Sequence, residues 1–310
     1  MRAVQFTRYG PPGVLELAEV DEPHAGPGEI RIAVRASGLS VGETLIRSGA
    51  MRDAVPATFP WRTGFDAAGV IDEVGEGVTG AEVGDEVFGW VAMARRGANA
   101  DYAVLVAWAP KPTAWTWEEA GGAAGAVETA TRVLDRLDVR EGQTVLINGA
   151  AGGVGTVAVQ MAVARGARVL GTASEHNHDF LRSLGAQPTT YGAGLAERVP
   201  GAVDAAFDCA SGALPDLIAL TGTPDRVVTI SDFTAASHGV HLSSGATDAL
   251  AVHALALAVD LAAQDRLTIP VAAVFPLTEA PKAHELSETR HARGKIVFSG
   301  SDPHAPSRPS

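Results

Sequence analysis

The chain has 310 residues, 46% of them hydrophobic and 19% charged, a composition that supports one large or two ordinary domains and argues against wholesale disorder. Its 36 acidic residues outnumber its 24 basic ones and give a formal net charge of −12, which argues against a broad nucleic-acid-binding surface because such surfaces need basic clusters. The single cysteine, Cys209, excludes an intrachain disulfide and a cysteine-rich zinc site.

The first residues do not resemble a secretion signal, since residues 1–6 have the pattern of a strand. The most apolar stretch, residues 249–263, is too short to span a bilayer and contains His253 and Asp260. We therefore expect a cytoplasmic protein without membrane association. The proline- and serine-rich residues 301–310 are expected to be frayed.

Short apolar segments separated by glycine and proline predict a mostly β structure in the N-terminal part of the chain. The predicted strands cover residues 2–6, 29–36, 67–74, 86–91 and 103–105. From about Trp115 the composition shifts toward alanine with helical periodicity.

Strands and helices alternate in the second part of the chain, which is typical of a parallel, doubly wound sheet. Further strands are predicted at residues 145–147, 168–172, 205–207, 226–230, 271–275 and 295–298. A long alanine-rich helix is predicted over residues 247–264. Cys209 lies in the apolar run 205–210 without an obvious activating neighbour, and we expect a buried structural thiol.

The segment from Val145 to Gly155, VLINGAAGGVG, reads as a buried strand, a glycine turn and the start of a helix. Gly152 would let the backbone approach a pyrophosphate, and Gly155 would let the helix pack on the strand. The free N–H groups at the helix start would attract phosphate. This context predicts a nucleotide site; the alternative is a glycine-rich turn in an ordinary α/β domain.

The motif has alanine at its first position, giving A-x-G-x-x-G across Ala150, Gly152 and Gly155. This form resembles the zinc-independent quinone oxidoreductases of the medium-chain dehydrogenase/reductase superfamily. Further matching segments follow in family order, at residues 9–17, 36–49, 64–78, 84–89, 126–130 and 294–298. The resemblance implies an α/β fold with two domains. Residues 1–118 and 271–310 would form a discontinuous, mostly β GroES-like catalytic domain, and residues 119–270 a doubly wound Rossmann NADP-binding domain.

The end of the second Rossmann strand decides between NAD and NADP. Ser174 is small and uncharged where an acidic residue would repel a 2′-phosphate, so we expect NADPH rather than NADH. Asn177 stands about where relatives often have lysine, which weakens this preference. The hydroxyl of Thr129 would contact the cofactor or merely cap a helix. The resemblance implies cofactor contacts from Thr129, Ala151, Gly152, Gly153, Val154, Gly155, Ser174, Asn177 and Tyr191.

Zinc alcohol dehydrogenases place a catalytic cysteine where this chain has Ser40, and a His-Glu pair where it has Phe65 and Asp66. Since serine and phenylalanine are not zinc ligands, we expect no zinc. Ser40 and Glu43 are candidate substrate-site residues, although Glu43 could instead be a solvated helix residue. Relatives have a tyrosine at the position of Leu45, which cannot donate a proton.

The expected activity is hydride transfer from NADPH to a quinone or an α,β-unsaturated carbonyl without zinc. The alternatives are a dedicated biosynthetic reductase for a polyketide-like enone or ketone, and a non-catalytic NADPH-binding protein. The expected partners are a small-molecule substrate and a second copy of the chain. The resemblance implies a homodimer formed through an edge strand of the nucleotide-domain sheet, near residues 269–275.

Overall fold

The computed structural model describes residues 1–300, so the segment expected to be frayed lies outside the described residues. The chain packs as two compact units. One comprises residues 1–125 and the chain from Ile269 onward, and the other comprises residues 126–268. The predicted domain boundaries, at 118/119 and 270/271, stay a prediction.

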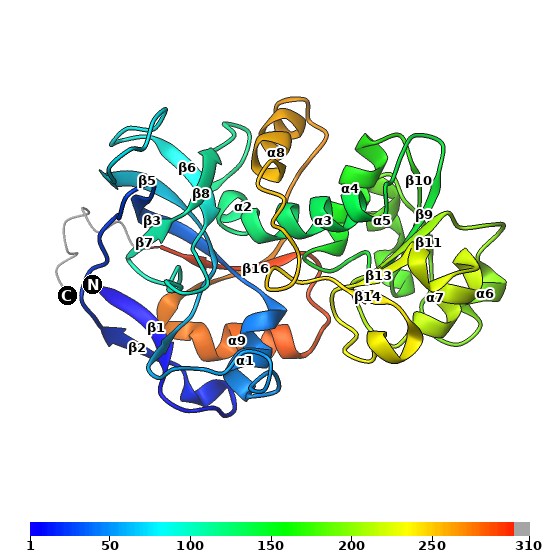
Figure 1. The fold of residues 1–310 in the computed structure, drawn as a ribbon, viewed down its shortest axis with the longest axis horizontal. Helices are drawn as coiled ribbons and strands as arrows, with labels where there is room; N and C mark the ends of the chain where they lie inside the picture. The colour runs from blue at the N-terminus through cyan, green and yellow to red at the C-terminus, as the bar shows by residue number, and fades with distance from the viewer. Residues whose placement is uncertain (301–310) are drawn as a thin grey trace. The chain divides into compact units, whose positions relative to one another are not determined.

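The first unit is built on strands that pair antiparallel, apart from the parallel pair β15 and β16 (Figure 1). A three-stranded sheet has the order β2-β1-β4, formed by Glu16–Glu19, Arg2–Phe6 and Trp61–Arg62. A seven-stranded sheet has the order β15-β16-β3-β5-β6-β8, with β7 also paired to β3. Its strands are β3 (Ile30–Leu39), β5 (Asp66–Val74), β6 (Glu86–Trp90), β7 (Tyr102–Leu105), β8 (Ala107–Pro110), β15 (Val271–Pro276) and β16 (Lys295–Ser299).

Few helices accompany these strands, as the sequence predicts. They are α1 (Val41–Ser48), α2 (Trp117–Gly121) and α9 (Ala280–Glu288), with 3-10 turns η1 (Pro12–Val14) and η5 (Leu277–Glu279). The side chains of Phe6, Trp61 and Phe298 share one buried apolar cluster, which joins the small sheet to the C-terminal strand.

The second unit contains a six-stranded sheet in the order β11-β10-β9-β12-β13-β14, and every neighbouring pair is parallel. This confirms the doubly wound sheet, and Figure 1 shows α4, α5 and α7 beside it. The strands are β9 (Thr144–Asn148), β10 (Arg168–Thr172), β11 (Gln187–Thr189), β12 (Ala205–Asp208), β13 (Val227–Thr229) and β14 (His241–Leu242).

The helices that connect these strands begin with α3 (Ala124–Arg136), whose first residues belong to the other unit. The remaining helices are α4 (Gly155–Ala164), α5 (His178–Ser183), α6 (Leu195–Arg198), α7 (Leu214–Thr221) and α8 (Ala254–Ala263), with 3-10 turns η2 (Glu175–Asn177), η3 (Pro224–Arg226) and η4 (Ala235–His238). Helix α4 is buried along most of its length, because its valine and alanine side chains pack on every side.

Two sequence predictions are wrong here. The helix predicted over residues 247–264 begins only at Ala254, since the preceding residues form a loop held by side-chain contacts. The strand near residues 269–275 is an edge strand, but it belongs to the seven-stranded sheet, where Val274 pairs with Val297 of β16. It is therefore not the edge of the nucleotide-domain sheet.

Within the described residues, none of the helices combines the length and the apolar composition that a membrane crossing requires.

Candidate functional site

The glycine turn between β9 and α4 requires glycine at two positions. Gly149 follows β9 with a φ of +76°, a left-handed conformation that glycine adopts readily. A Cβ atom at Gly155 would lie 2.2 Å from the Gly149 carbonyl oxygen and 2.8 Å from the Ala150 Cα atom. Gly155 therefore lets the helix start directly against the turn, at the two residues that follow β9.

Gly152 has a different environment. A Cβ atom there would meet only the Gly149 carbonyl oxygen, at 3.4 Å, and the residue does not have a left-handed φ. Neither packing nor backbone conformation within the described chain requires glycine at this position. The approach of a pyrophosphate to the backbone at Gly152 stays a prediction, and the sparse surroundings of this residue are compatible with it.

The backbone amides around Gly152 fit an anion. The amide of Ala150 donates to the Thr172 carbonyl at 3.0 Å, and that of Gly152 donates to the Gly149 carbonyl at 3.1 Å. The next three amides, those of Gly153, Val154 and Gly155, donate to no protein acceptor within residues 1–300. Unsatisfied N–H groups at the start of a helix are the donors that phosphate prefers. Ala151 and Val154 are half-buried beside them.

The residues predicted to select the cofactor lie at the same edge of the sheet. Ser174 follows β10, and its hydroxyl accepts a hydrogen bond from the Asn177 side-chain amide at 3.3 Å. Asn177 is 8% exposed, so its side chain faces Ser174 rather than solvent. Tyr191 follows β11 and is 57% exposed, and no hydrogen bond within residues 1–300 joins its hydroxyl to Ser174 or Asn177.

A buried row of polar side chains lies beneath the turn, and sequence reasoning missed it. It runs along the carboxyl ends of four neighbouring strands, from Thr172 through Asn148 and Asp208 to Thr229, and all four side chains are at most 2% exposed. The Thr172 hydroxyl donates to Asn148 at 2.6 Å, and the Asn148 amide donates to Asp208 at 2.7 Å. The Thr229 hydroxyl donates to the second Asp208 oxygen at 2.7 Å.

This polar row holds the loops that follow the strands. Thr172 accepts a hydrogen bond from the Gly149 amide at 2.9 Å, and Asp208 accepts from the Ala210 and Ser211 amides at 3.1 and 3.2 Å. In the sequence, a polar residue ending each of four apolar strands was the available signal. Ligands of open parallel sheets bind outside these strand ends, so the row supports the candidate cofactor site.

Cys209 follows Asp208 directly and is half-buried. Burial, and then the charge of Asp208, raise the pKa of its thiol well above the ordinary value. A protonated thiol is a poor nucleophile, which agrees with the structural role predicted for it.

Ser40 and Glu43 form the N-terminal cap of α1. The Ser40 hydroxyl accepts from the Glu43 amide at 3.4 Å, and the Glu43 carboxylate accepts from the Ser40 amide at 2.9 Å. The other carboxylate oxygen accepts from the Gly64 amide, and from the Asn99 side chain at 3.5 Å.

Glu43 is only 3% exposed, so the alternative of a solvated helix residue is wrong. Burial raises the pKa of its carboxyl to about 7, although hydrogen bonds from the Ser40 and Gly64 amides oppose the shift. Ser40 is half-buried at the helix start, as is Leu45 within the helix.

The positions that hold zinc ligands in alcohol dehydrogenases contain another arrangement. The Lys295 ammonium lies 3.8 Å from an Asp66 carboxylate oxygen, and each side chain is 6% exposed. Asp66 thus has a cationic neighbour, in accord with a structural role. Within residues 1–300, no group of three or more His, Cys, Asp or Glu side chains is arranged to hold a metal ion.

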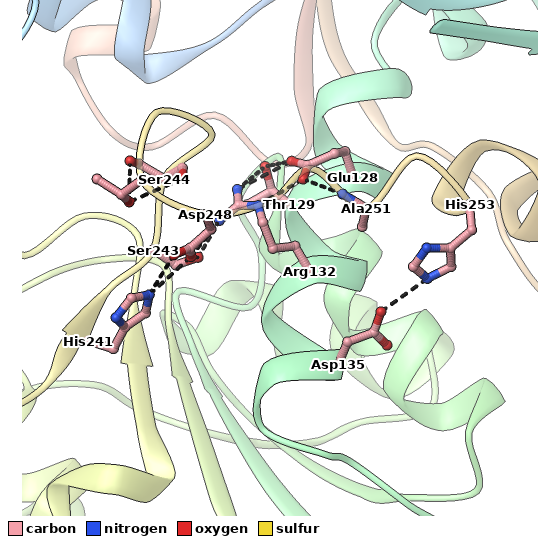
Figure 2. A network of polar contacts seen from close by, with 11 residues as sticks. Glu128, Thr129, Arg132, Asp135, His241, Ser243, Ser244, Asp248, Ala251 and His253 are labelled. Carbon is pink, nitrogen blue, oxygen red and sulfur yellow. Dashed lines mark hydrogen bonds and ion pairs between the residues drawn. The ribbon is translucent and has the colours of Figure 1, made fainter.

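Thr129 lies inside α3 and not at its start, because the helix begins at Ala124, so the helix-cap alternative is wrong. Its hydroxyl donates to Glu128 at 3.3 Å and accepts from Arg132 at 3.4 Å (Figure 2). Both partners are buried, so the hydroxyl belongs to a charged network that the sequence did not reveal.

Two family models match the chain. Residues 26–137 match the alcohol dehydrogenase GroES-like domain, and residues 184–298 match the zinc-binding dehydrogenase family.

Curated relatives include a quinone oxidoreductase and parts of polyketide synthases. The chloroplastic quinone-oxidoreductase QR1 of Triphysaria versicolor is 30% identical over 96% of this chain and 98% of its own length. The polyketide synthase GfsB of Streptomyces halstedii is 39% identical over 198 residues, which are 61% of this chain and only 3% of that synthase. The chain thus spans a small fraction of such synthases.

Solved structures agree with these matches. The quinone oxidoreductase of Coxiella burnetii has a TM-score of 0.85 and 29% identity, covering 97% of this chain and 99% of that one. A mycobacterial protein solved as a complex with NADPH has a TM-score of 0.81 and 27% identity, covering 96% of this chain and 99% of that one.

The fold is therefore shared with proteins that are matched along nearly their full length. The chain belongs to the quinone oxidoreductase-like family of the medium-chain dehydrogenase/reductase superfamily.

Proposed function

We propose that this protein is an oxidoreductase that uses NADPH to reduce a quinone or an α,β-unsaturated carbonyl without a bound zinc. The observation that carries the proposal is the open space at Gly152 beside the three unsatisfied amides of residues 153–155. A structural neighbour with 27% identity was solved with NADPH, which supports the choice of cofactor.

The residues of the chain would hold the cofactor at three places. The amides of Gly153, Val154 and Gly155 would bind the pyrophosphate, and Ser174 with Asn177 would face the 2′-phosphate. Thr129 would contact the cofactor through its hydroxyl. Tyr191, at the same edge of the sheet, would line the phosphate pocket.

When bound, NADPH supplies a hydride, while the protein supplies orientation and excludes water. Ser40 and Phe65 stand where zinc ligands would be needed, so the proposal involves no Lewis acid, and electron-poor acceptors suit it best. The Ser40 hydroxyl would hydrogen-bond the substrate. Glu43, whose carboxylate oxygens both accept hydrogen bonds from the protein, would position Ser40. Protons for the reduced oxygens would come from water.

The test is a titration with NADPH and NADH, followed by addition of 1,4-benzoquinone or a simple enone while the absorbance at 340 nm is recorded. We expect tighter binding of NADPH, and loss of absorbance only when an acceptor is present. Binding without oxidation across a broad panel of quinones and enones would argue against the reductase. Binding of neither nucleotide would contradict the cofactor site.

A second candidate is a dedicated biosynthetic reductase for a polyketide-like enone or ketone. The 39% identity to a segment of the polyketide synthase GfsB favours it. A narrow substrate range with a high kcat/KM would distinguish it from a general quinone reductase. Submicromolar NADPH binding without any turnover would instead indicate a non-catalytic NADPH-binding protein.

We also propose that the protein is located in the cytoplasm and forms a homodimer.

A further inference from the structure

The loop between β14 and α8, residues 243–253, is held largely by side-chain contacts. The Ser243 hydroxyl donates to Asp248 at 2.5 Å, and the His241 Nε2 atom lies 3.0 Å from both Asp248 oxygens. The Asp248 amide donates back to the Ser244 carbonyl at 2.9 Å. Asp248 thus connects the middle of the loop to its first residues and to the end of β14.

Helix α3 holds this loop through one arginine (Figure 2). Arg132 donates to the two Glu128 oxygens at 2.7 and 3.2 Å, a bidentate pair one helical turn apart. It also donates to the Ser243 hydroxyl and lies 3.6 Å from Asp248. Glu128 in turn accepts from the Ala251 amide at 3.1 Å, so the helix contacts both ends of the loop.

These charges are removed from solvent. The side chains of Arg132 and Glu128 are 7% and 6% exposed, and that of Asp248 is 13% exposed. Burial acts to raise the pKa of Asp248, but the hydrogen bonds from Ser243 and His241, with the charges of His241 and Arg132, lower it below its ordinary value. Asp248 is therefore ionised at neutral pH, and Arg132 serves two carboxylates.

The network lies at the end of the parallel sheet that faces the candidate cofactor site. β14 is parallel to β13, so Ser243 leaves the sheet at the same carboxyl edge as the glycine turn. The Ser243 amide donates to the Thr229 carbonyl at 2.8 Å, next to the polar row beneath the turn. Thr129 shares both of its hydroxyl partners, Glu128 and Arg132, with the network.

Stability alone does not explain such an arrangement. A buried ion pair recovers little more than the cost of desolvating its charges, and apolar residues of similar volume often stabilise a fold equally well or better. A forked guanidinium with four fixed partners does, however, define one orientation for every group that it contacts.

We infer that Arg132 is a positioning residue, which with Glu128 clamps loop 243–253 onto α3 and fixes the Thr129 hydroxyl, the group that the proposed function assigns to a cofactor contact. The functional part of this inference rests on the proposed NADPH site. The clamp itself is independent of that proposal, and the two can be tested separately.

The decisive variant is Glu128→Leu/Arg132→Met, which removes the ion pair while keeping its volume. Arg132→Met alone would leave Glu128 buried without its partner and would destabilise the fold. We expect the double variant to keep its melting temperature within a few degrees, because Asp248 loses a neighbour at 3.6 Å but keeps its contacts with Ser243 and His241. Hydrogen–deuterium exchange of loop 243–253 should become at least tenfold faster, while exchange in β9 and β12 stays unchanged. The Kd for NADPH should rise about tenfold and kcat should fall.

The matched control is Arg140→Met, because Arg140 is also paired, with Asp138, but its side chain is 72% exposed. It should change none of these quantities. Unchanged exchange in the double variant would overturn the clamp. Faster exchange with unaltered Kd and kcat would overturn its positioning role. If the wild-type chain binds no NADPH, the proposed function fails, while the exchange measurement still decides the clamp.

Discussion

Glu43 and His284 are both buried in the first unit, and each keeps the neutral form of its side chain over an unusual pH range. His284 on α9 is fully buried, and neither ring nitrogen has a hydrogen-bond partner among the described residues. Burial, and then the nearby Arg47 charge, lower the pKa of His284 to about 3. The pKa of the Glu43 carboxyl is shifted in the opposite direction and is raised to about 7.

These shifts predict opposing effects of pH on stability. Below the ordinary histidine pKa of 6.5, His284 is protonated in the unfolded chain but stays neutral in the folded one. The free energy of unfolding therefore falls as the pH drops from 6.5 to about 3. Between 4.5 and about 7, folded Glu43 keeps a proton that the unfolded chain releases, so its contribution is complete below 4.5 and is lost as the pH rises through 7. Each slope is about 1.4 kcal/mol per pH unit.

In the wild type, the contributions of His284 and Glu43 to the pH dependence of stability cancel between pH 4.5 and 6.5. Variants that remove one of the two groups should therefore reveal the contribution of the other. Relative to wild type, His284→Leu should gain stability as the pH falls, because leucine cannot be protonated. Glu43→Gln should gain relative stability as the pH rises from 4.5 to 7, although it loses a cap acceptor at every pH. Urea unfolding across this range measures both. Differences from wild type that do not depend on pH would contradict the assigned protonation states.

At the scale of elements, the strand–turn–helix unit predicts different effects for two glycine-to-alanine substitutions. They should differ in their effect on the melting temperature. In Gly155→Ala, the new methyl group would lie 2.2 Å from the Gly149 carbonyl oxygen, so α4 must move away from the turn. Both the melting temperature and NADPH binding should fall. In Gly152→Ala, the methyl group would meet only the Gly149 carbonyl oxygen, at 3.4 Å, so the melting temperature should stay within about 1–2 °C, a shift worth no more than about 1 kcal/mol. Only the Kd for NADPH should rise, by tenfold or more.

Thermal unfolding and NADPH titration of the two variants check this prediction. Equal NADPH affinity in Gly152→Ala and wild type would show that no phosphate approaches the turn. A stable Gly155→Ala protein would contradict the close packing of the helix start.

The same scale shows where local patterns mislead. The alanine-rich run from residue 247 has good helix formers, yet the helix begins at Ala254. The Ala251 amide instead donates to Glu128, far away in the sequence. A helix propensity of a few tenths of a kcal/mol per residue does not outweigh such tertiary contacts.

At the scale of the whole molecule, we propose a homodimer. Two copies would be related by a two-fold axis, the commonest symmetry of soluble oligomers. Strand β15 is an edge strand of the seven-stranded sheet with Val274 46% exposed, which makes it one candidate contact. Light scattering should give twice the chain mass of 31.8 kDa. A value near the single-chain mass would contradict the dimer, and Val274→Lys tests whether this edge contributes.

The sequence by itself determined the parts of this protein that depend on neighbouring residues. The apolar runs located β1, β9 and β10 to within a residue, because a buried strand needs consecutive apolar side chains. The glycine turn was predicted with its helix, and the order of motifs along the chain identified the family. The strands and the turn are each encoded in a short segment, and the family is indicated by the order of such segments along the chain.

Only the tertiary structure decided which polar groups meet. The hydrogen bonds of Asp208 and of Glu43, and the pairing of Arg132 with Ser243, join residues from separate elements. A single sequence records that such residues are polar but not what they face, and burial and pKa depend on what they face. The Glu43 environment and the loop clamp therefore became visible only when distant segments were brought together.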